Sequence, residues 1–454
     1  MKTKEIVLSY APVCIQNLAI TLYNMWLHKR RRGGAYRGYL KYFSDFRDAD
    51  FFTIDREQQR RLREFLEHAV RRSVWYRDYS PSDLMSFPVL EKEQLLNNLD
   101  LIKTVAEKEG DVSLTGGTTG ASMKVVYTLE DIQERHAILD LFRSAYGYAQ
   151  GKRTAWFSGK AVARRGDLAR GICYRDDHLR NIRYFSTFHI SSDNFDAYWR
   201  SFTSFAPEFI VGFPSSVYDM CVMARERGLE FKGSVRAFFP TAETVLPTYR
   251  EVIGSVLGCR LYDQYASSEG APFILECENG GLHIHPLTGV FEVVDDDLEP
   301  TIEGQLLVTS FSTRGTPLIR YRIGDRVKLA PSDYRCSCGS AFPVVEFIDG
   351  RTSDFLWSPQ NGRVNLGNIS NCTKDVKGIV CFQIVQESVD SVTVFVVSGT
   401  GYDQEQEDRF RRALLLRLGD RVTITIQTVE KIARETSGKF RLVKNFLTTK
   451  ELPD

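Results

Sequence analysis

The sequence predicts an α/β protein made of a large N-terminal domain and a small α+β C-terminal domain. Helical and β-rich segments alternate through most of the chain, which is typical of sheets with substantial parallel pairing. The last hundred residues change to a β-β-α-β string that is self-sufficient as a small domain. The length of 454 residues corresponds to two or three domains of about 100–200 residues each.

Composition narrows the class of protein. Hydrophobic residues make up 43% and charged residues 26% of the chain, as in ordinary globular proteins. The 59 Lys and Arg residues balance 58 Asp and Glu residues to a net charge of +1, which excludes the basic surface of a general nucleic-acid binder. Nine scattered cysteines are too few for a disulfide-built secreted scaffold, so we expect a reducing cytoplasm.

The first segment, residues 6–27, is fairly apolar and runs into the basic cluster 29–32. Gln16, Asn17 and Asn24 interrupt it, whereas a membrane-spanning helix needs about 20 mostly apolar residues. No small-residue cleavage site follows, so a signal peptide is not expected. We expect an amphipathic helix packed on its own domain. The alternative is a peripheral anchor whose basic cluster touches anionic lipid.

Apolar periodicity predicts the elements of the large domain in order. They are a helix over 56–73, a strand at Val125–Tyr127, a helix over 130–147, a buried strand at Phe209–Val211, a helix carrying Leu246, Tyr249, Ile253 and Val256 on one face, and a strand at Arg260–Tyr265.

In the small domain the same patterns predict two strands, a helix and a final strand. They are Gly378–Gln386, Ser391–Val397, Gln404–Leu418, and a strand in which Val422, Ile424 and Ile426 alternate. A boundary within 350–358 separates the domains, which we place at 1–353 and 354–454.

The strongest local motif is rich in glycine and threonine. It consists of Thr115, Gly116, Gly117, Thr118, Thr119 and Gly120. Glycines allow a tight turn with exposed amide donors, and threonine hydroxyls add donors for phosphate oxygens. No Lys-Ser or Lys-Thr pair follows, so it is not a Walker A motif. An ordinary turn is the alternative.

Three further clusters carry polar side chains suited to a nucleotide. In the first, Tyr265 can stack on a base, Ser268 can touch phosphate, and Glu269 can hold magnesium, which prefers oxygen ligands. In the second, Asp325 can accept both ribose hydroxyls, although a capping aspartate in a turn is the alternative. The third is Lys439, on a glycine-flanked loop near the C-terminus.

These four motifs in this order resemble the adenylate-forming ligases, which include acyl-CoA synthetases, peptide-synthetase adenylation domains and luciferases. Within that superfamily, the chain is most similar to phenylacetate–CoA ligases and to the CapK-like proteins of capsular-polysaccharide biosynthesis. The resemblance extends from about residue 60 to residue 445. It implies a multi-subdomain N-terminal adenylation domain and a mobile C-terminal domain.

The resemblance also implies roles for individual residues. The loop from Thr115 to Gly120 would cover the β- and γ-phosphates, and Ala242 and Glu243 would lie beside adenine and the acyl pocket. Tyr265 would stack on adenine, Ser268 would contact phosphate, and Glu269 would hold magnesium. Asp325 would bind ribose with help from Arg351. Asp354 would be the hinge, and Lys439 would reach the carboxylate and α-phosphate during adenylation.

Two half-sites suggest a second metal. Cys277 and His283 form one half-site, and Cys336 and Cys338 form the other, each beside a glycine-rich turn. They can close one tetrahedral structural zinc site if their strands are neighbours, with His285 as an alternative ligand. The other interpretation is one buried cysteine and two surface thiols. Some relatives of the phenylacetate–CoA ligase type look similar here and hold zinc.

The predicted function is therefore AMP-forming activation of a carboxylic acid by ATP and magnesium, followed by transfer to coenzyme A. The segment 357–370 does not resemble the corresponding loop of phenylacetate–CoA ligases, so an amine or hydroxyl acceptor in cell-surface polysaccharide biosynthesis is the alternative. A catalytically silent nucleotide-binding homologue is the third hypothesis. No nucleic-acid partner is expected, and membrane contact is expected to be peripheral at most.

Overall fold

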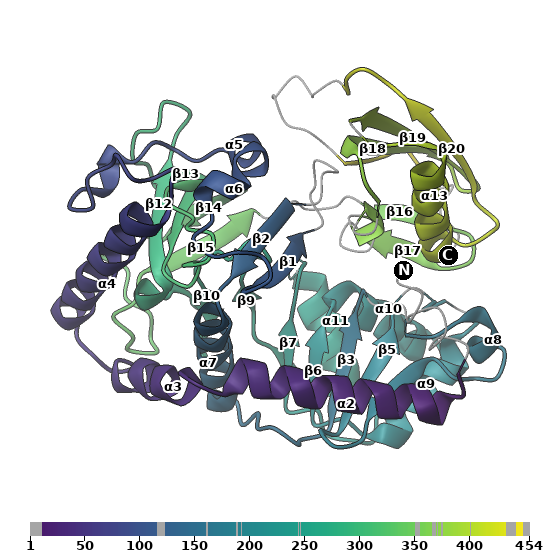
Figure 1. Ribbon diagram of the computed structural model, residues 1–454. Coiled ribbons are helices and arrows are strands. Elements are labelled where there is room, and N and C mark those ends of the chain that lie inside the picture. The colour runs from purple at the N-terminus through teal and green to yellow at the C-terminus, as the bar shows by residue number, and fades with distance from the viewer. Residues whose placement is uncertain are drawn as a thin grey trace.

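The chain forms two large sheets, a small C-terminal domain and a set of outer helices, as the computed structural model in Figure 1 shows. The structure describes residues 11–115, 123–159, 162–187, 189–191, 193–243, 245, 247–349, 355–365, 369, 371–373, 376–399, 401–432 and 442–447. A six-stranded sheet and a seven-stranded sheet make up the N-terminal part. The predicted mixed α/β class with a separate C-terminal part is confirmed.

The six-stranded sheet supplies the parallel pairing that the sequence predicts. Its order is β4-β5-β3-β6-β7-β8, and only β4 runs antiparallel. The strands are β3 (Thr154–Ser158), β4 (Tyr174–Asp177), β5 (Ile182–Ser186), β6 (Phe209–Gly212), β7 (Ala237–Pro240) and β8 (Arg260–Leu261). The helices of this subdomain are α8 (Arg165–Leu168), α9 (Phe195–Phe205), α10 (Pro214–Glu226) and α11 (Pro247–Leu257). Every residue of β6 and β7 is buried, as expected of central parallel strands.

Gly212 ends β6 and has to be glycine. Its φ is +136°, and a Cβ atom there would lie 1.7 Å from the carbonyl oxygen of Phe157 on β3. The chain then enters α10 directly at Pro214, a residue suited to the first turn of a helix.

The seven-stranded sheet is wholly antiparallel, which periodicity did not predict. Its order is β12-β13-β14-β15-β11-β10-β9. The strands are β9 (Gln264–Tyr265), β10 (Ile274–Glu276), β11 (Leu282–Ile284), β12 (Gly289–Val294), β13 (Glu303–Ser310), β14 (Tyr321–Leu329) and β15 (Val344–Asp349), with the short helix η2 (Pro286–Thr288) between β11 and β12. The separate hairpin of β1 (Asp111–Thr115) and β2 (Met123–Tyr127) confirms the predicted strand at Val125–Tyr127.

The single strand predicted at Arg260–Tyr265 is wrong. The segment forms two strands of two residues, β8 and β9, and each belongs to a different sheet. Tyr262 and Asp263 make the step from one sheet to the other. Residue preferences do not reveal such a step, because it depends on which neighbours each half pairs with.

The predicted helices of the N-terminal part are present. Helix α4 (Phe51–Arg72) begins five residues before the predicted start because the Asp50 carboxylate accepts a hydrogen bond from the Thr53 amide, at 3.0 Å. Helix α7 (Leu129–Ala145) matches the prediction over 130–147. Of the predicted face on α11, Leu246 lies outside the described residues. The remaining helices here are α2 (Val13–Arg32), α3 (Tyr36–Asp45), η1 (Leu84–Ser86), α5 (Lys92–Asn97) and α6 (Leu99–Ile102).

The C-terminal part contains the predicted β-β-α-β string and two additions. The string is β18 (Ile379–Ser388), β19 (Ser391–Ser398), α13 (Gln404–Leu418) and β20 (Thr423–Thr428). The additions are β21 (Val443–Asn445), which pairs in parallel with β18, and the hairpin β16 (Phe355–Ser358) and β17 (Gly362–Asn365), with η3 (Asn371–Thr373) after it. One apolar core unites these elements. The exact boundary at residues 353 and 354 stays a prediction.

None of the helices in the described part of the chain is both long enough and apolar enough to cross a bilayer. Helix α2 lies along the outside of the N-terminal part, against β4 and α7 (Figure 1).

Candidate functional site

Two residues predicted to bind one nucleotide lie in direct contact. The Tyr265 hydroxyl, on β9, donates a hydrogen bond of 2.7 Å to Oδ2 of Asp325, on β14. Both side chains are partly buried. A ring that can stack on a base and a carboxylate that can accept ribose hydroxyls therefore share one place, although 60 residues separate them in sequence.

A β-bulge positions Asp325. Between two paired positions, β14 has the three residues 323–325 where β13 has only Leu306, and the register shifts there. Gly324 takes a φ of +90°, a conformation that glycine adopts at little cost. A bulge bends its strand and redirects a side chain, which is how Asp325 comes to face Tyr265. The turn with a capping aspartate, the alternative interpretation of this cluster, is not what the structure shows, because these residues lie within β14.

The loop after β9 is attached to the hairpin that carries the predicted phosphate loop. The backbone oxygen of Ser268 accepts hydrogen bonds from the Tyr127 hydroxyl at 2.9 Å and from Ser113 Oγ at 3.3 Å. Burial raises the pKa of Tyr127, the positive charge of Arg135 lowers it, and the negative charges of Glu269 and Asp131 raise it. Ser268 is exposed and Glu269 is partly buried. Two motifs far apart in sequence thus meet at β2.

Arg135 on α7 holds the same loop from the other side, and the sequence analysis missed it. Its Nη1 donates to the backbone oxygens of Gly270 at 3.1 Å and Ala271 at 3.0 Å, and to Ser312 Oγ at 3.1 Å. The guanidinium also lies 4.6 Å from the ring centre of Phe273. Arg135 is a positioning residue, and one arginine within a helical pattern gives no sequence signal for that role.

Ala242 and Glu243 lie just beyond the carboxyl end of β7, the edge where α/β sheets bind ligands. Ala242 has a φ of +65°, unusual for a residue with a side chain. The Glu243 carboxylate accepts from the amide and the hydroxyl of Ser215, each at 3.0 Å, and so caps the start of α10. A place beside adenine stays a prediction for both residues.

Gln264 and Arg143, which the sequence analysis also missed, join β7 to β9. Gln264 Nε2 donates to the backbone oxygen of Pro240 at 3.0 Å, and its Oε1 accepts from Arg143 Nη2 at 3.0 Å. All three are buried or nearly so. The segment 240–243 and Tyr265 are therefore fixed relative to each other through Gln264.

Two carboxyls lie close together at the step between β8 and β9: the partly buried Asp263 of the step and the buried Glu276 at the end of β10. The Glu276 carboxylate accepts from Arg250 Nη2 and from the Asp263 amide, both at 2.7 Å. Burial, followed by the nearby charge of Glu276, raises the pKa of Asp263 to about 6. Asp263 therefore takes up a proton at a higher pH than an ordinary aspartate.

Several predicted site residues lie outside the described residues. They are Gly116, Gly117, Thr118, Thr119 and Gly120 of the phosphate loop, with Arg351, Asp354 and Lys439. Thr115 is the last residue of β1. Their assigned roles stay predictions.

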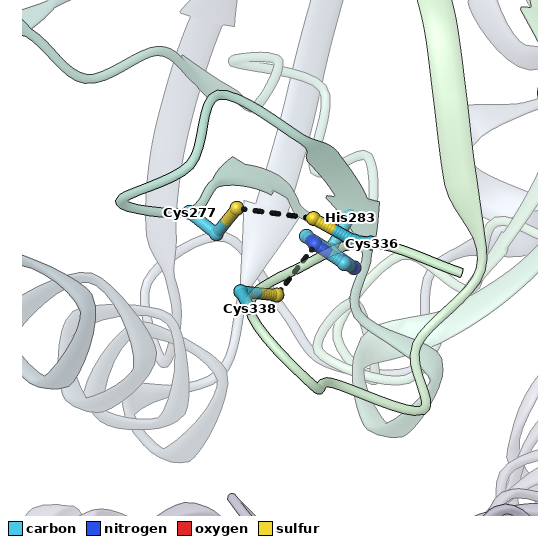
Figure 2. A group of neighbouring side chains, drawn as sticks. All are labelled: Cys277, His283, Cys336 and Cys338. Atoms are coloured by element: carbon cyan, nitrogen blue, oxygen red, sulfur yellow. Dashed lines mark hydrogen bonds between the residues drawn. The ribbon is translucent and has the colours of Figure 1, made fainter.

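The four predicted zinc ligands come together, as Figure 2 shows. The ligand atoms of Cys277, His283, Cys336 and Cys338 all lie within 4.8 Å of one another. Cys277 follows β10 directly and His283 lies on β11, whereas Cys336 and Cys338 lie in the connection from β14 to β15. The two half-sites are neighbours, as the zinc hypothesis requires. Cys336 is buried and Cys277 and Cys338 are partly buried, so the interpretation as one buried cysteine and two surface thiols stays the alternative.

Two separations within the cluster are close to those of a tetrahedral zinc site. The sulfurs of Cys277 and Cys336 are 3.6 Å apart, and Cys338 Sγ is 3.3 Å from His283 Nε2. Ligands at ~2.3 Å for sulfur and ~2.0 Å for nitrogen around one zinc would be about 3.8 Å and 3.5 Å apart. Gly281 leaves room for an ion, because a Cβ atom there would lie 2.8 Å from Cys336 Sγ.

The surroundings also suit metal binding. His283 Nδ1 donates to the backbone oxygen of Phe342 at 3.0 Å, which leaves Nε2 as the ligand atom. The Gly281 amide donates to Cys277 Sγ at 3.3 Å. His285, the alternative ligand, is not in the cluster; its ring packs edge-on against Phe43 and Phe342.

Comparison with known proteins agrees with this geometry. The family described as the CapK C-terminal domain matches residues 356–446. Protein CapK of Staphylococcus aureus is 28% identical over 456 residues, covering 96% of this chain and 98% of CapK. The phenylacetate-coenzyme A ligase of Escherichia coli is 26% identical over 340 residues, covering 66% of this chain and 71% of the ligase.

Among solved structures, a 2-hydroxyisobutyryl-CoA ligase in complex with 2-HIB-AMP and CoA aligns with a TM-score of 0.55. It is 20% identical, and the alignment covers 88% of this chain and 91% of the ligase. At that identity the match shows the fold alone. Together with the sequence relatives, it confirms the resemblance found in the motifs: the chain is a homologue of CapK and of the phenylacetate-coenzyme A ligases, and it has the fold of the adenylate-forming ligases.

Proposed function

We propose that the chain activates a carboxylic acid with ATP to an acyl-adenylate, releases pyrophosphate, and then transfers the acyl group to coenzyme A. The observation that carries the proposal is the contact between Tyr265 and Asp325, beside a loop bonded to the β1–β2 hairpin. The curated relatives named as phenylacetate-coenzyme A ligases support the same reaction class. The acid itself is left open by this proposal.

In the first step the acid's carboxylate oxygen attacks the α-phosphorus of ATP, and the bond to the pyrophosphate oxygen breaks. Catalysis of such a step consists mainly of positioning and charge stabilisation. Tyr265 and Asp325 would hold the nucleoside, and the 115–120 loop would hold the outer phosphates. Lys439 would donate to the carboxylate and α-phosphate oxygens.

Magnesium, when bound, would neutralise phosphate charge. Glu269 would hold the ion, and the neighbouring Ser268 would contact phosphate. The position of Glu269 suits that role because it follows Ser268, whose backbone oxygen accepts hydrogen bonds from the hairpin that leads into the phosphate loop. Arg135 would keep the loop that carries Glu269 in place through its contacts with Gly270 and Ala271.

In the second step the acceptor attacks the acyl carbon, and AMP leaves. Rotation of the C-terminal domain about Asp354 would withdraw Lys439 and open this face to the acceptor. Closure in the first step would exclude water, which otherwise hydrolyses the acyl-adenylate.

An amine or hydroxyl acceptor in polysaccharide biosynthesis is the second candidate. The near full-length relative CapK carries no acceptor in its name, and the match to the phenylacetate ligase covers two thirds of this chain, so these matches leave the acceptor open. A relative named indoleacetate–lysine synthetase, 22% identical over 72% of this chain, is named for an amine acceptor.

We further propose that the Cys277–His283–Cys336–Cys338 cluster holds a structural zinc ion. Four protein ligands leave no open position for catalysis. Thiolate ligands require reduced cysteines, which is consistent with the proposed cytoplasmic location. The zinc would join the β10–β11 turn to the β14–β15 connection and so brace the sheet that carries Tyr265.

The test is pyrophosphate release from ATP and magnesium with a panel of carboxylic acids, with hydroxylamine present to trap acyl-adenylate. We expect acid-dependent release that Lys439→Ala lowers by at least 100-fold. Lys431→Ala, which removes an exposed lysine from the same domain, is the matched control. Replacing hydroxylamine by coenzyme A or by amines then identifies the acceptor. ATP binding without release for any acid would favour the silent homologue.

A further inference from the structure

Helix α2 attaches to the protein through a face that carries three amide side chains beside the partly buried Val13, Ile20 and Leu27. Gln16 Oε1 accepts from Arg175 Nε at 2.8 Å, and Asn24 Nδ2 donates to Asp177 Oδ2 at 2.8 Å. Between them, Asn17 is buried and its Oδ1 accepts from the Asp176 amide at 3.2 Å. These amides are the residues that interrupt the apolar run in the sequence. The large apolar residues that are exposed lie on a different face of the helix.

The opposite side of α2 is apolar and exposed, the reverse of an ordinary surface helix. We call it the α2 outer face. It consists of Ile15, Leu18, Leu22, Tyr23, Met25 and Trp26, each between 45% and 58% exposed. Ile15, Leu18, Leu22, Met25 and Trp26 follow one another at 3, 4, 3 and 1 residues, which keeps them on one surface of the helix. Tyr23 joins them because its ring stacks on Trp26. Scattered exposed apolar residues need no explanation, but a continuous row does.

Charge identifies what covers this face. Residues 6–44 contain no Asp or Glu and six Lys or Arg residues, at 29–32, 37 and 41, in a chain whose net charge is only +1. Lys29 and Arg37 are exposed. Arg30 pairs with Asp111 at 2.8 Å and lies over the Trp26 ring. An acid-free apolar face with cations at its end is complementary to an anionic surface.

The chemistry of the face favours lipid over a second copy of the chain. A symmetric dimer through α2 would bring together two copies of a segment that has no carboxylate to pair with Lys29. Trp and Tyr with Leu and Met are the side chains that settle at a bilayer interface, with cations at the headgroups. The described helices include none that spans a bilayer, so the contact is a surface one.

We propose that α2 is an interfacial helix whose outer face lies on an anionic membrane surface. Its 20 residues would lie flat, with Leu18, Leu22 and Trp26 in the acyl boundary and Lys29 and Arg37 at the headgroups. The hydrogen bonds of Gln16, Asn17 and Asn24 hold the helix to β4 and the β4–β5 region. Binding would therefore place the whole enzyme at the membrane without unfolding α2.

The test is co-sedimentation of the full-length protein with vesicles of phosphatidylcholine alone or with about one third phosphatidylglycerol. We expect binding to the anionic vesicles and weak binding to the neutral ones. Leu18→Gln with Leu22→Gln is expected to weaken the partition coefficient at least tenfold. The matched control, Met85→Gln with Ile302→Gln, replaces exposed apolar side chains elsewhere and should stay within twofold. Lys29→Gln should lower the partition coefficient into anionic vesicles about fivefold at low salt.

Tryptophan fluorescence reports the orientation. Trp26 is exposed, whereas the other four tryptophans are buried or partly buried. Brominated lipids should quench the wild-type emission, and Trp26→Phe should remove most of that quenching while it still sediments with vesicles. Thermal unfolding of each variant checks that the fold is kept.

Three results would overturn the proposal: no binding to anionic vesicles, equal binding by Leu18→Gln/Leu22→Gln, or a dimer in sedimentation velocity that this double variant dissociates. None of these readouts depends on the ligase activity, so they separate this proposal from the proposed function.

Discussion

Tyr265→Phe isolates the contact on which the proposed nucleotide site rests. The substitution keeps the ring that would stack on adenine and removes only the hydroxyl that donates to Asp325 Oδ2 at 2.7 Å. A hydrogen bond to a charged group contributes about 1.5–3 kcal/mol. If that energy positions Asp325 for the ribose, its loss corresponds to a factor of roughly 10 to 150 in ATP binding.

The assay is the KM for ATP in acid-dependent pyrophosphate release, with direct ATP binding by calorimetry as a second readout. Tyr265→Phe should raise the KM at least tenfold and lower the free energy of unfolding by at most about 3 kcal/mol, the upper value for the hydrogen bond that it removes. The control is Tyr76→Phe, which removes a buried hydroxyl bonded to the Pro317 carbonyl at 3.2 Å. It should lower stability by about 1 kcal/mol and leave the KM unchanged.

A double-mutant cycle with Asp325→Asn tests the coupling. The two single effects should not add, and the interaction energy should be about 1–3 kcal/mol. A KM within twofold of wild type for Tyr265→Phe, with a large effect of Asp325→Asn, would refute the positioning role of the hydroxyl. No effect of either substitution would refute the nucleotide site itself.

Three further predictions follow from the sites. Gly281→Ala places a Cβ atom 2.8 Å from Cys336 Sγ, so the variant should hold well under half of the wild-type zinc by metal analysis and should melt at a lower temperature. Gly38→Ala, where no atom lies within 4 Å of the new Cβ, should keep the wild-type zinc content and melting temperature. A full zinc content in Gly281→Ala would argue against an ion at this position. The pKa of Asp263 is about 6 in the folded protein and 3.8 for an ordinary aspartate. Ionisation of this carboxyl therefore lowers the free energy of unfolding as the pH rises from about 4 to above 6. Asp263→Asn should therefore exceed wild type in urea-unfolding free energy by up to about 3 kcal/mol at pH 8, and the gap should vanish below pH 4; an equal gap at both pH values would show that ionisation is not the cause. Arg135→Gln should lower kcat/KM for pyrophosphate release at least tenfold, because the guanidinium no longer holds Gly270 and Ala271, while the exposed Arg56→Gln should not; equal rates would show that the loop holds itself in place.

The sequence alone determined the local elements and the chemical character of the site. Helices such as α4 and α13 follow from apolar spacing, and short motifs identified Tyr265, Asp325 and the two cysteine half-sites, because backbone geometry and side-chain chemistry act over a few residues. The resemblance carried by those motifs predicted the reaction class. The sequence relatives and the structural match agree with it, since they include CoA ligases and a ligase of the same fold.

Only the tertiary structure decided what depends on pairing between distant segments. The strand expected at Arg260–Tyr265 divides between two sheets because each half finds a different neighbour. The bulge at Gly324 aims Asp325 at Tyr265, and the neighbouring strands β11 and β15 bring Cys277 and His283 to Cys336 and Cys338. Arg135 and the inverted face of α2 were hidden for the same reason. A sequence gives the period of a helix, but what lies against each face is fixed by the packing of the whole chain.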